Sequence, residues 1–135
     1  MERLKRKKCS VCKESKPIDN FYKDKNDRRG YRSYCKICAK QYNINNPEKI
    51  KNIQLKHHFG ISLEEYNNMF KEQDGRCSIC GKHQSRFKTM FSVDHDHVTG
   101  KIRGLLCPDC NHGLGNFKDT PRILQKAIEY LNKHK

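Results

Sequence analysis

The sequence contains no tryptophan and no long apolar run. A membrane-spanning helix needs roughly 20 consecutive apolar residues, and no segment approaches that length, so we expect no membrane contact. The first residues, MERLKRKK, also lack the apolar segment of a secretory signal. We therefore expect the chain to stay in the cytoplasm, where disulfides are rare.

Apolar side chains are also scarce, which limits the core. Only 34% of the 135 residues are hydrophobic, while 33% are charged. A chain of this length fits one small domain with an appended module, but burial alone would leave it marginally stable. We therefore expect a crosslink that supplements the core.

Eight cysteines are the candidates for that crosslink, and all of them occur in Cys-x-x-Cys pairs. The pairs are Cys9/Cys12, Cys35/Cys38, Cys77/Cys80 and Cys107/Cys110. In a reducing compartment, such pairs indicate structural zinc sites with four thiolate ligands. We expect two Zn²⁺ ions, the first bound by the first two pairs and the second by the last two. Reactive thiol clusters, and exchange of one ligand for a nearby histidine in the first site, are the alternatives.

The net charge is strongly positive and uneven. It is +14 in total, with 17 Lys/Arg against 6 Asp/Glu in residues 1–60 and 12 against 9 in residues 61–135. Each loaded zinc site lowers the charge by two, which leaves about +10. A field of this sign concentrates polyanions, and DNA is the partner we expect. A generic solubilising surface is the alternative.

The spacing of these features predicts three parts. Residues 1–41 form a basic tail (1–8) and a four-cysteine module, residues 42–60 a basic helical connector, and residues 61–135 the remaining domain. In the module, two cysteine pairs flank a segment with a predicted hairpin, as in a zinc ribbon or treble-clef finger whose second knuckle opens a helix near Cys35. Its aromatic residues fill a small core or stack on bases; they are Phe21, Tyr22, Tyr31 and Tyr34.

The connector and the start of the third part carry helix signals. Asn46 and Pro47 predict a helix that runs to about His58, either a strut along a phosphate backbone or a solvated spacer. Ser62-Leu63-Glu64-Glu65 predicts a capping box, and the helix that follows extends to about Gln73.

The rest of the third part alternates strands and helices. We predict strands at 90–93 and 101–106, and a helical stretch that starts at Asn111 and is interrupted by Gly113 and Gly115. Thr120 and Pro121 open the last helix. Its apolar stripe needs a partner, either the 63–70 helix or a second copy in a homodimer; the stripe comprises Ile123, Leu124, Ala127, Ile128 and Leu131.

Four alternating ionisable residues lie between the last two cysteine pairs: Asp94, His95, Asp96 and His97. If the strand persists, the two aspartates share one face and the two histidines the other. Carboxylate oxygens suit a hard divalent cation, and imidazoles suit proton transfer near neutral pH. Phosphodiester hydrolysis needs both. A solvated charged turn is the alternative.

This run, with Gly100-Lys101-Ile102-Arg103-Gly104-Leu105-Leu106-Cys107, Cys110-Asn111 and the upstream Cys77-Ser78-Ile79-Cys80-Gly81, resembles the phage recombination endonuclease VII family over residues 60–119. The resemblance implies a small α+β, zinc-stabilised fold. Its centre would be a ββα-metal nuclease core (His-Me finger, HNH-like), with the amino-terminal zinc module and flanking helices added. A phage-encoded chain would act in the host cytosol.

The resemblance also implies roles for individual residues. Asp94 and Asn111 would bind a catalytic Mg²⁺ or Mn²⁺, His95 would activate water as a general base, and His97 would assist at the phosphate. Lys101 and Arg103 would contact nucleic acid. Leu114 departs from relatives that place an acidic residue there, and His112 beside Asn111 is a further candidate ligand.

The expected function is a metal-dependent DNA endonuclease, acting on branched DNA or as an HNH nicking, homing or restriction enzyme. A non-catalytic zinc-finger protein that binds nucleic acid is the second hypothesis. A partner of a larger replication complex is the third. The joint presence of Asp94, His95 and Asn111 favours the first, because binding alone requires none of them.

Overall fold

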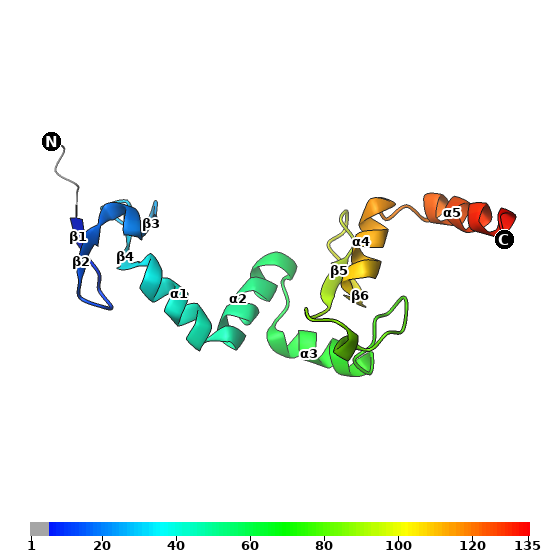
Figure 1. Cartoon of the computed structure of the whole chain (residues 1–135), viewed down its shortest axis with the longest axis horizontal. Helices are drawn as coiled ribbons and strands as arrows, with labels where there is room; N and C mark the ends of the chain where they lie inside the picture. The colour runs from blue at the N-terminus through cyan, green and yellow to red at the C-terminus, as the bar shows by residue number, and fades with distance from the viewer. Residues whose placement is uncertain (1–5) are drawn as a thin grey trace. The chain divides into compact units, whose positions relative to one another are not determined.

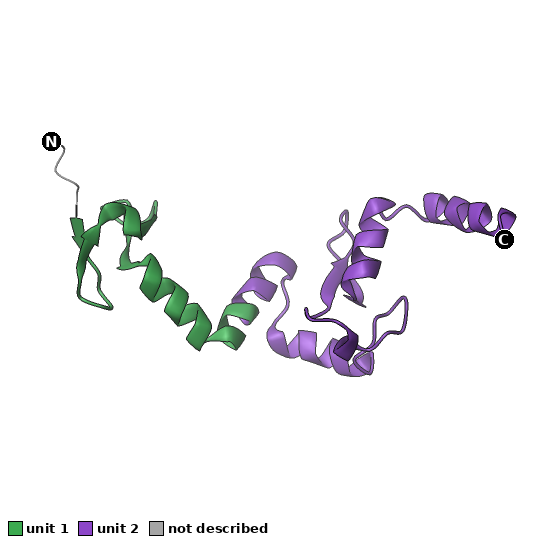
Figure 2. Cartoon of the chain, viewed as in Figure 1, with its two compact units in different colours: residues 1–51 green, residues 52–135 purple. Residues whose placement is uncertain are grey.

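The computed structural model describes residues 6–135 and divides the chain into two compact units, residues 1–51 and 52–135 (Figure 2). The boundary falls inside helix α2 (Pro47–Phe59), within the predicted connector. The three-part division at residues 41 and 60 stays a prediction. The predicted basic tail, residues 1–8, lies mostly outside the described residues. Among the helices of residues 6–135, none has the length and apolarity to cross a membrane.

The first unit is a small zinc-finger fold with two hairpins and a helix (Figure 1). Strand β1 pairs antiparallel with β2, and β3 pairs antiparallel with β4. The core is small: Phe21 is 2% exposed and packs with the buried Cys9 and Cys35. The elements are β1 (Arg6–Lys8), β2 (Ser15–Pro17), the 3-10 turn η1 (Ile18–Asn20), β3 (Phe21–Lys23), β4 (Tyr31–Cys35) and α1 (Lys36–Asn45).

The second unit places a two-stranded hairpin between helices (Figure 1). Strands β5 and β6 pair antiparallel, α3 packs against β6, and α4 packs against β5. Residues from α2, α3 and the hairpin form one core around Tyr66, Phe91 and Leu105. The elements after α2 are α3 (Leu63–Glu72), η2 (Gln84–Arg86), β5 (Ser92–His95), β6 (Ile102–Leu106), α4 (Pro108–Asn116) and α5 (Pro121–Lys133).

Each unit contains the same knuckle, hairpin and helix, and the same four backbone hydrogen bonds hold them together. Cys35 and Cys107 each cap the following helix in an extended conformation. In the first unit, backbone N–H groups donate from Cys9 to Glu14 O, from Lys13 to Cys9 O, from Ser10 to Ser33 O and from Cys35 to Cys9 Sγ. In the second unit, the corresponding bonds run from Cys77 to Lys82 O, from Gly81 to Cys77 O, from Ser78 to Leu105 O and from Cys107 to Cys77 Sγ. The predicted treble-clef arrangement is confirmed, and it occurs twice.

Helix α3 fixes the hairpin of the second unit. The predicted capping box is present, with Ser62 and Glu65 bonded reciprocally. The hydroxyl of the buried Tyr66 donates to the Phe91 carbonyl at 2.8 Å. Beyond the helix end, Gln73 Oε1 accepts from Leu105 N at 2.8 Å while its Nε2 donates to Leu105 O at 3.0 Å. Gln73 thus bonds β6 as a neighbouring strand would.

Two predicted boundaries near the site are wrong. The first strand starts at Ser92 rather than Met90, because the Gln84 side chain bonds Thr89 O and Phe91 N and holds this segment as a loop. Helix α4 starts at Pro108 rather than Asn111, since proline is well suited to a first helical turn. It also continues through Gly113 and Gly115.

The last helix also differs from the simpler prediction. No residue of α5 is buried, and Ile128 and Leu131 are 51% and 62% exposed. Its apolar stripe is therefore not covered by the 63–70 helix. Pro121 does open the helix, with Thr120 at the cap position, as predicted. A homodimer interface along this stripe stays a prediction.

We predict that Gln73→Ala lowers the free energy of unfolding of the second unit by about 1–3 kcal/mol, because it leaves the backbone N–H of Leu105 in β6 without its partner. Urea unfolding followed by circular dichroism, with zinc present, measures the change. Glu72→Ala, an exposed neighbour on the same helix, is the matched control. Equal midpoints for the two variants would show that the Gln73 bonds do not stabilise the hairpin.

Candidate functional site

The two cysteine clusters have the dimensions of zinc sites. In each, the four sulfur atoms lie within 4.8 Å of one another. The Sγ atoms of Cys9 and Cys38 are 3.9 Å apart, and those of Cys80 and Cys107 are 3.7 Å apart. A tetrahedral site with Zn–S bonds of about 2.3 Å has edges of about 3.8 Å, whereas a disulfide needs about 2.05 Å. The predicted grouping of all eight cysteines is confirmed.

In each cluster, hydrogen bonds from backbone N–H groups lower the pKa of one cysteine. Burial raises the pKa of Cys9 and Cys77, but hydrogen bonds from backbone N–H groups outweigh burial and lower both pKa values to about 6. Burial, together with the neighbouring cysteines, raises the pKa of Cys38 to about 12 and also raises that of Cys110. A cation in the cluster would favour the thiolate form of all four. The donor sets therefore fit Zn²⁺.

We predict two zinc ions per chain and a separate structural role for each. Cys35→Ser should remove one ion and unfold the first unit, and Cys107→Ser should remove the other and unfold the second, because binding and folding are coupled at such sites. Elemental analysis with NMR spectra of each variant measures both effects. Loss of both ions from either variant would show that the sites are not independent.

The β5–β6 hairpin carries a bulge at the predicted catalytic run. Asp94 lies opposite Gly104 and His95 lies opposite Ile102, so Arg103 is the extra residue between them. A bulge of this kind redirects a side chain. Gly104 has φ of +156°, and a Cβ there would lie 3.0 Å from Ser78 Oγ. The close approach of the zinc knuckle therefore requires glycine beside the bulge.

The bulged Arg103 bridges two carboxylates. Its Nε donates to Asp94 Oδ2 at 2.7 Å and its terminal nitrogen to Asp94 Oδ1 at 2.9 Å, and the same nitrogen reaches Asp119 Oδ2 at 3.2 Å. The bond with Asp94 is the main cause that raises the pKa of Arg103. The side chain of Asp94 is only 12% exposed. Asp94 is therefore held in one orientation.

Asp119 is a residue that the motif did not predict. Besides Arg103, it contacts His97, with 3.4 Å between His97 Nε2 and Asp119 Oδ2. It lies in the loop after α4 with a left-handed backbone, φ of 49°. A small cavity of about 320 Å³ lies beside Asp94, Arg103 and Asp119 and is otherwise lined by residues of the knuckle, β6, α4 and α5. The role of Asp119 in the site follows only from its contacts with Arg103 and His97 in the folded chain.

The predicted alternation ends at His95, because strand β5 ends there. Asp96 does not join Asp94. Its Oδ1 accepts from the backbone N–H groups of Val98 and Thr99 at 2.9 and 2.7 Å, and these bonds lower its pKa. Asp96 therefore closes the turn between the strands, and a shared carboxylate face is not present.

The two histidines of the run lie together. The ring centroids of His95 and His97 are 4.7 Å apart, and the His95 ring also meets the edge of Phe59 at 5.4 Å. Phe59 is the last residue of α2 and packs against the core. An aromatic neighbour on a separate helix thus limits the rotation of the His95 ring.

Asn111 lies one helical turn after Cys107 of the second cysteine cluster, and its backbone N–H donates to Cys107 O at 3.0 Å. Its side chain is half-buried, and within residues 6–135 the amide makes no hydrogen bond. Helix α4, which carries it, packs against β5. His112 and Lys101 are exposed. The ligand roles of Asn111 and His112 and the DNA contacts of Lys101 and Arg103 stay predictions.

The family comparison matches this same region. A family model described as recombination endonuclease VII matches residues 51–133, which is more than half of the chain. The chain belongs to the recombination endonuclease VII family. The match extends beyond residues 60–119 on both sides and includes most of helix α2 and all of helix α5. The family resemblance inferred from the motif is therefore confirmed.

Viral proteins are among the relatives of this family member. The chain is 49% identical to the Gene 59 protein of Mycobacterium phage D29 over 76 residues, which are 56% of this chain and 46% of that protein. It is 46% identical to the Gene 59 protein of Mycobacterium phage L5 over 74 residues, 54% of this chain and 44% of that protein. The chain thus spans less than half the length of these curated relatives.

A solved structure was also found. It is a crystal structure of the beta-beta-alpha-Me type II restriction endonuclease Hpy99I, 30% identical to this chain, with a TM-score of 0.41. The comparison covers 96% of this chain and 66% of that one.

Proposed function

We propose that this chain is a metal-dependent DNA endonuclease whose active site is the β5–β6 hairpin with helix α4. One observation carries the proposal: Asp94 and His95 lie on a hairpin that a four-cysteine cluster joins to the helix bearing Asn111, in a chain of the endonuclease VII family. Rigid placement of this kind is what a hydrolytic site needs.

The donor set fits a hard divalent cation. Asp94 offers an oriented carboxylate, and Asn111 offers a half-buried amide oxygen that no described protein group uses. Oxygen ligands of this type suit Mg²⁺ or Mn²⁺. When bound, the ion would neutralise charge that develops on the scissile phosphate and the leaving oxygen.

His95 is the proposed general base. Its ring contacts the rings of Phe59 and His97, which limit its rotation, so a ring nitrogen can take a proton from water in a constant direction. His97 contacts Asp119 but is 71% exposed, so its ring is accessible to a substrate phosphate.

Arg103 orients Asp94 and places positive charge beside the site. A guanidinium that already bonds two carboxylates is a positioning group first. We propose that one of its donors also contacts a substrate phosphate, and that Lys101 contributes a second, weaker contact.

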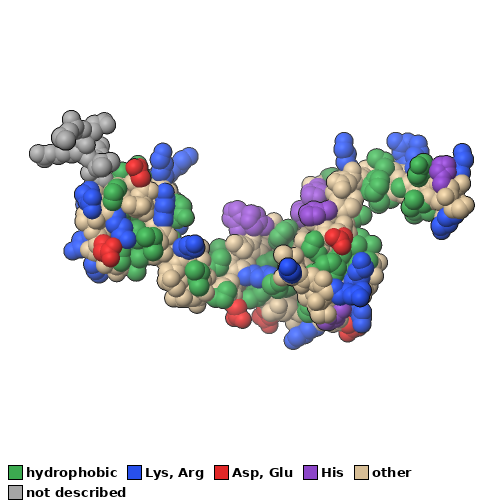
Figure 3. Space-filling model, viewed as in Figure 1, with side chains coloured by type: hydrophobic (Ala, Val, Ile, Leu, Met, Phe, Trp, Pro, Cys, Tyr) green, Lys and Arg blue, Asp and Glu red, His purple; other side chains and the backbone are tan. Residues whose placement is uncertain are grey.

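The charge pattern supports a nucleic-acid substrate. Lys and Arg side chains are spread over both units in the view of Figure 3, with few acidic ones, in agreement with the net charge of +14. The same charge would serve a non-catalytic binding protein, which is the alternative function. The joint presence of Asp94, His95 and Asn111 supports the nuclease, and a cleavage assay distinguishes the two functions.

We predict that the parent nicks or linearises supercoiled plasmid with Mg²⁺ or Mn²⁺, and that His95→Ala lowers the rate by about 10²–10⁴-fold, the usual contribution of a general base. Asn111→Ala should raise the metal concentration required. Gel analysis of plasmid forms measures both. His134→Ala, at the exposed residue just after the last helix, is the matched control. A parent that binds plasmid and leaves it intact with either ion would favour the binding protein.

Branched DNA is the substrate that we propose first, because the family is one of recombination endonucleases. We predict faster cleavage of a four-way junction than of nicked or linear duplex of the same sequence, measured with labelled oligonucleotides. Equal rates on all three would favour a linear-duplex nuclease. Whether one strand or both are cut is read from the same gels.

A further inference from the structure

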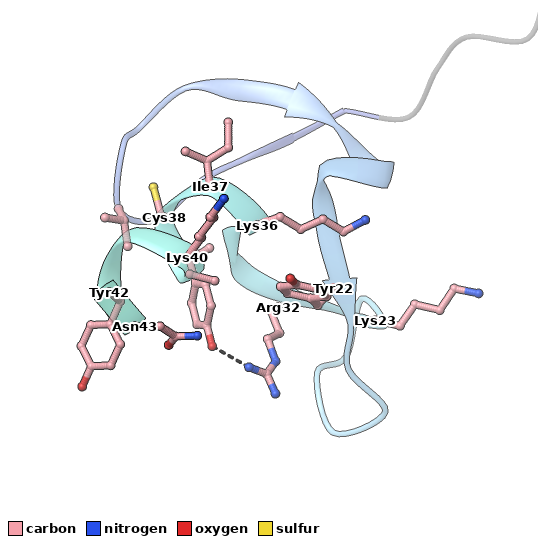
Figure 4. A pocket seen from close by; sticks show the side chains of 12 residues that line it. Tyr22, Lys23, Arg32, Lys36, Ile37, Cys38, Lys40, Tyr42 and Asn43 are labelled. Atoms are coloured by element: carbon pink, nitrogen blue, oxygen red, sulfur yellow. Dashed lines mark hydrogen bonds between the residues drawn. The ribbon is translucent and has the colours of Figure 1, made fainter. Parts of the chain in front are cut away.

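A groove of about 1130 Å³ lies in the first unit, outside the matched family region (Figure 4). The zinc knuckle, β3, β4 and α1 form its walls. Its lining combines aromatic, basic and aliphatic side chains and contains no acidic residue; the lining residues used below are Tyr22, Lys23, Arg32, Tyr34, Lys36, Lys40 and Tyr42.

Tyr22 and Tyr42 both line this groove and take no part in the core. Tyr22 is 48% exposed and Tyr42 is 46% exposed, whereas Phe21, next to Tyr22 on β3, is 2% exposed. Tyr31 and Tyr34 pack partly against the core. The two alternatives that the sequence left open thus apply to different residues: Phe21 fills the finger, and Tyr22 is available for contact.

A lysine ammonium group lies near the ring of each of these two tyrosines. Lys36 Nζ lies 5.6 Å from the centre of the Tyr22 ring, and Lys49 Nζ lies 5.8 Å from that of Tyr42. Arg32 donates to Tyr34 Oη at 2.7 Å, and its Nε lies 3.9 Å from Asp24 Oδ2 outside the groove. The lining of Lys23, Arg32, Lys36 and Lys40 stays net positive even with Asp24 included.

A positively charged groove with exposed aromatic faces suits unpaired nucleotides. Every base has a face that stacks on an aromatic ring, and its phosphate meets the adjacent cation. Paired bases inside a duplex are already stacked and do not offer their faces. An acidic peptide would satisfy the cations but would leave the tyrosine rings without a matching partner.

We propose that this groove binds an unpaired segment of the DNA, with bases stacked on Tyr22 and Tyr42 and phosphates bound by Lys23, Lys36 and Lys40. The proposal rests on the proposed function, because it assumes that DNA is the substrate. The first unit would then select DNA that contains unpaired nucleotides, a role separate from that of the hydrolytic residues of the second unit.

The test uses the full, zinc-loaded chain in buffer without Mg²⁺ and fluorescence anisotropy with three labelled ligands: a single-stranded oligonucleotide, an abasic oligonucleotide of equal length, and a duplex. The parent should bind the single strand more tightly than the other two. Tyr22→Leu and Tyr42→Leu should each weaken single-strand binding by about 5- to 100-fold, the range for loss of one stacked base. Binding of the abasic strand should change little.

Tyr130→Leu is the matched control, because Tyr130 is an exposed tyrosine on α5, with 64% exposure. Tyr22→Phe should retain the parent affinity, since it keeps the ring. Equal affinity of the parent for the single strand and the abasic strand, or tighter binding of duplex, would overturn the proposal. So would unchanged binding by both leucine variants.

Plasmid cleavage separates this proposal from the proposed function. A parent that cuts plasmid but shows no base-dependent binding retains the nuclease assignment and loses the groove assignment. A parent that shows base-dependent binding but never cuts retains the groove and loses the nuclease. Binding of a polyglutamate chain as tight as that of the single strand would also overturn the groove proposal, because it would show that charge alone accounts for affinity.

Discussion

The clustering of four cysteines, with the dimensions of a zinc site, is the constraint on which each unit depends. Apolar burial is small in each, and in the first unit it amounts to Phe21 packed with two cysteines. The sulfur atoms do more than crosslink the chain, because backbone N–H groups at the start of the following helix bond directly to Cys9 and Cys77. A metal-binding loop, a hairpin and a helix start are thereby joined at one point. Side chains near that point are held in place because the backbone that carries them is fixed.

Local signals predicted the elements that local chemistry controls. The capping box at Ser62, the proline start of α5 and the four cysteine pairs all have short-range causes, and the structure contains them. The predicted start of β5 was wrong because the Gln84 side chain bonds Thr89 O and Phe91 N and holds them in a loop. The local strand pattern gives no sign of this contact. The start of α4 was placed too late because Cys107, read only as a ligand, also caps the helix.

The sequence predicts which residue types form the site, but it does not predict all of the contacts among them. The motif indicates Asp94 and His95, but alternation also assigned Asp96 to the metal face, and the structure uses it to close a turn. Asp119 lies beyond the motif, and Phe59 lies 36 positions before His95. Neither has a sequence signal of its own, since each matters only through a neighbour that folding supplies.

The repeated zinc unit shows how little of the chain is needed to hold its shape. Four cysteines and a few backbone hydrogen bonds recur in both halves, while the segments between the cysteine pairs differ: tyrosines occur only in the first segment, and histidines occur only in the second. Such a scaffold can exchange its inserted loop without loss of its own stability. The two inserted segments can therefore carry different side chains on the same framework of knuckle, hairpin and helix.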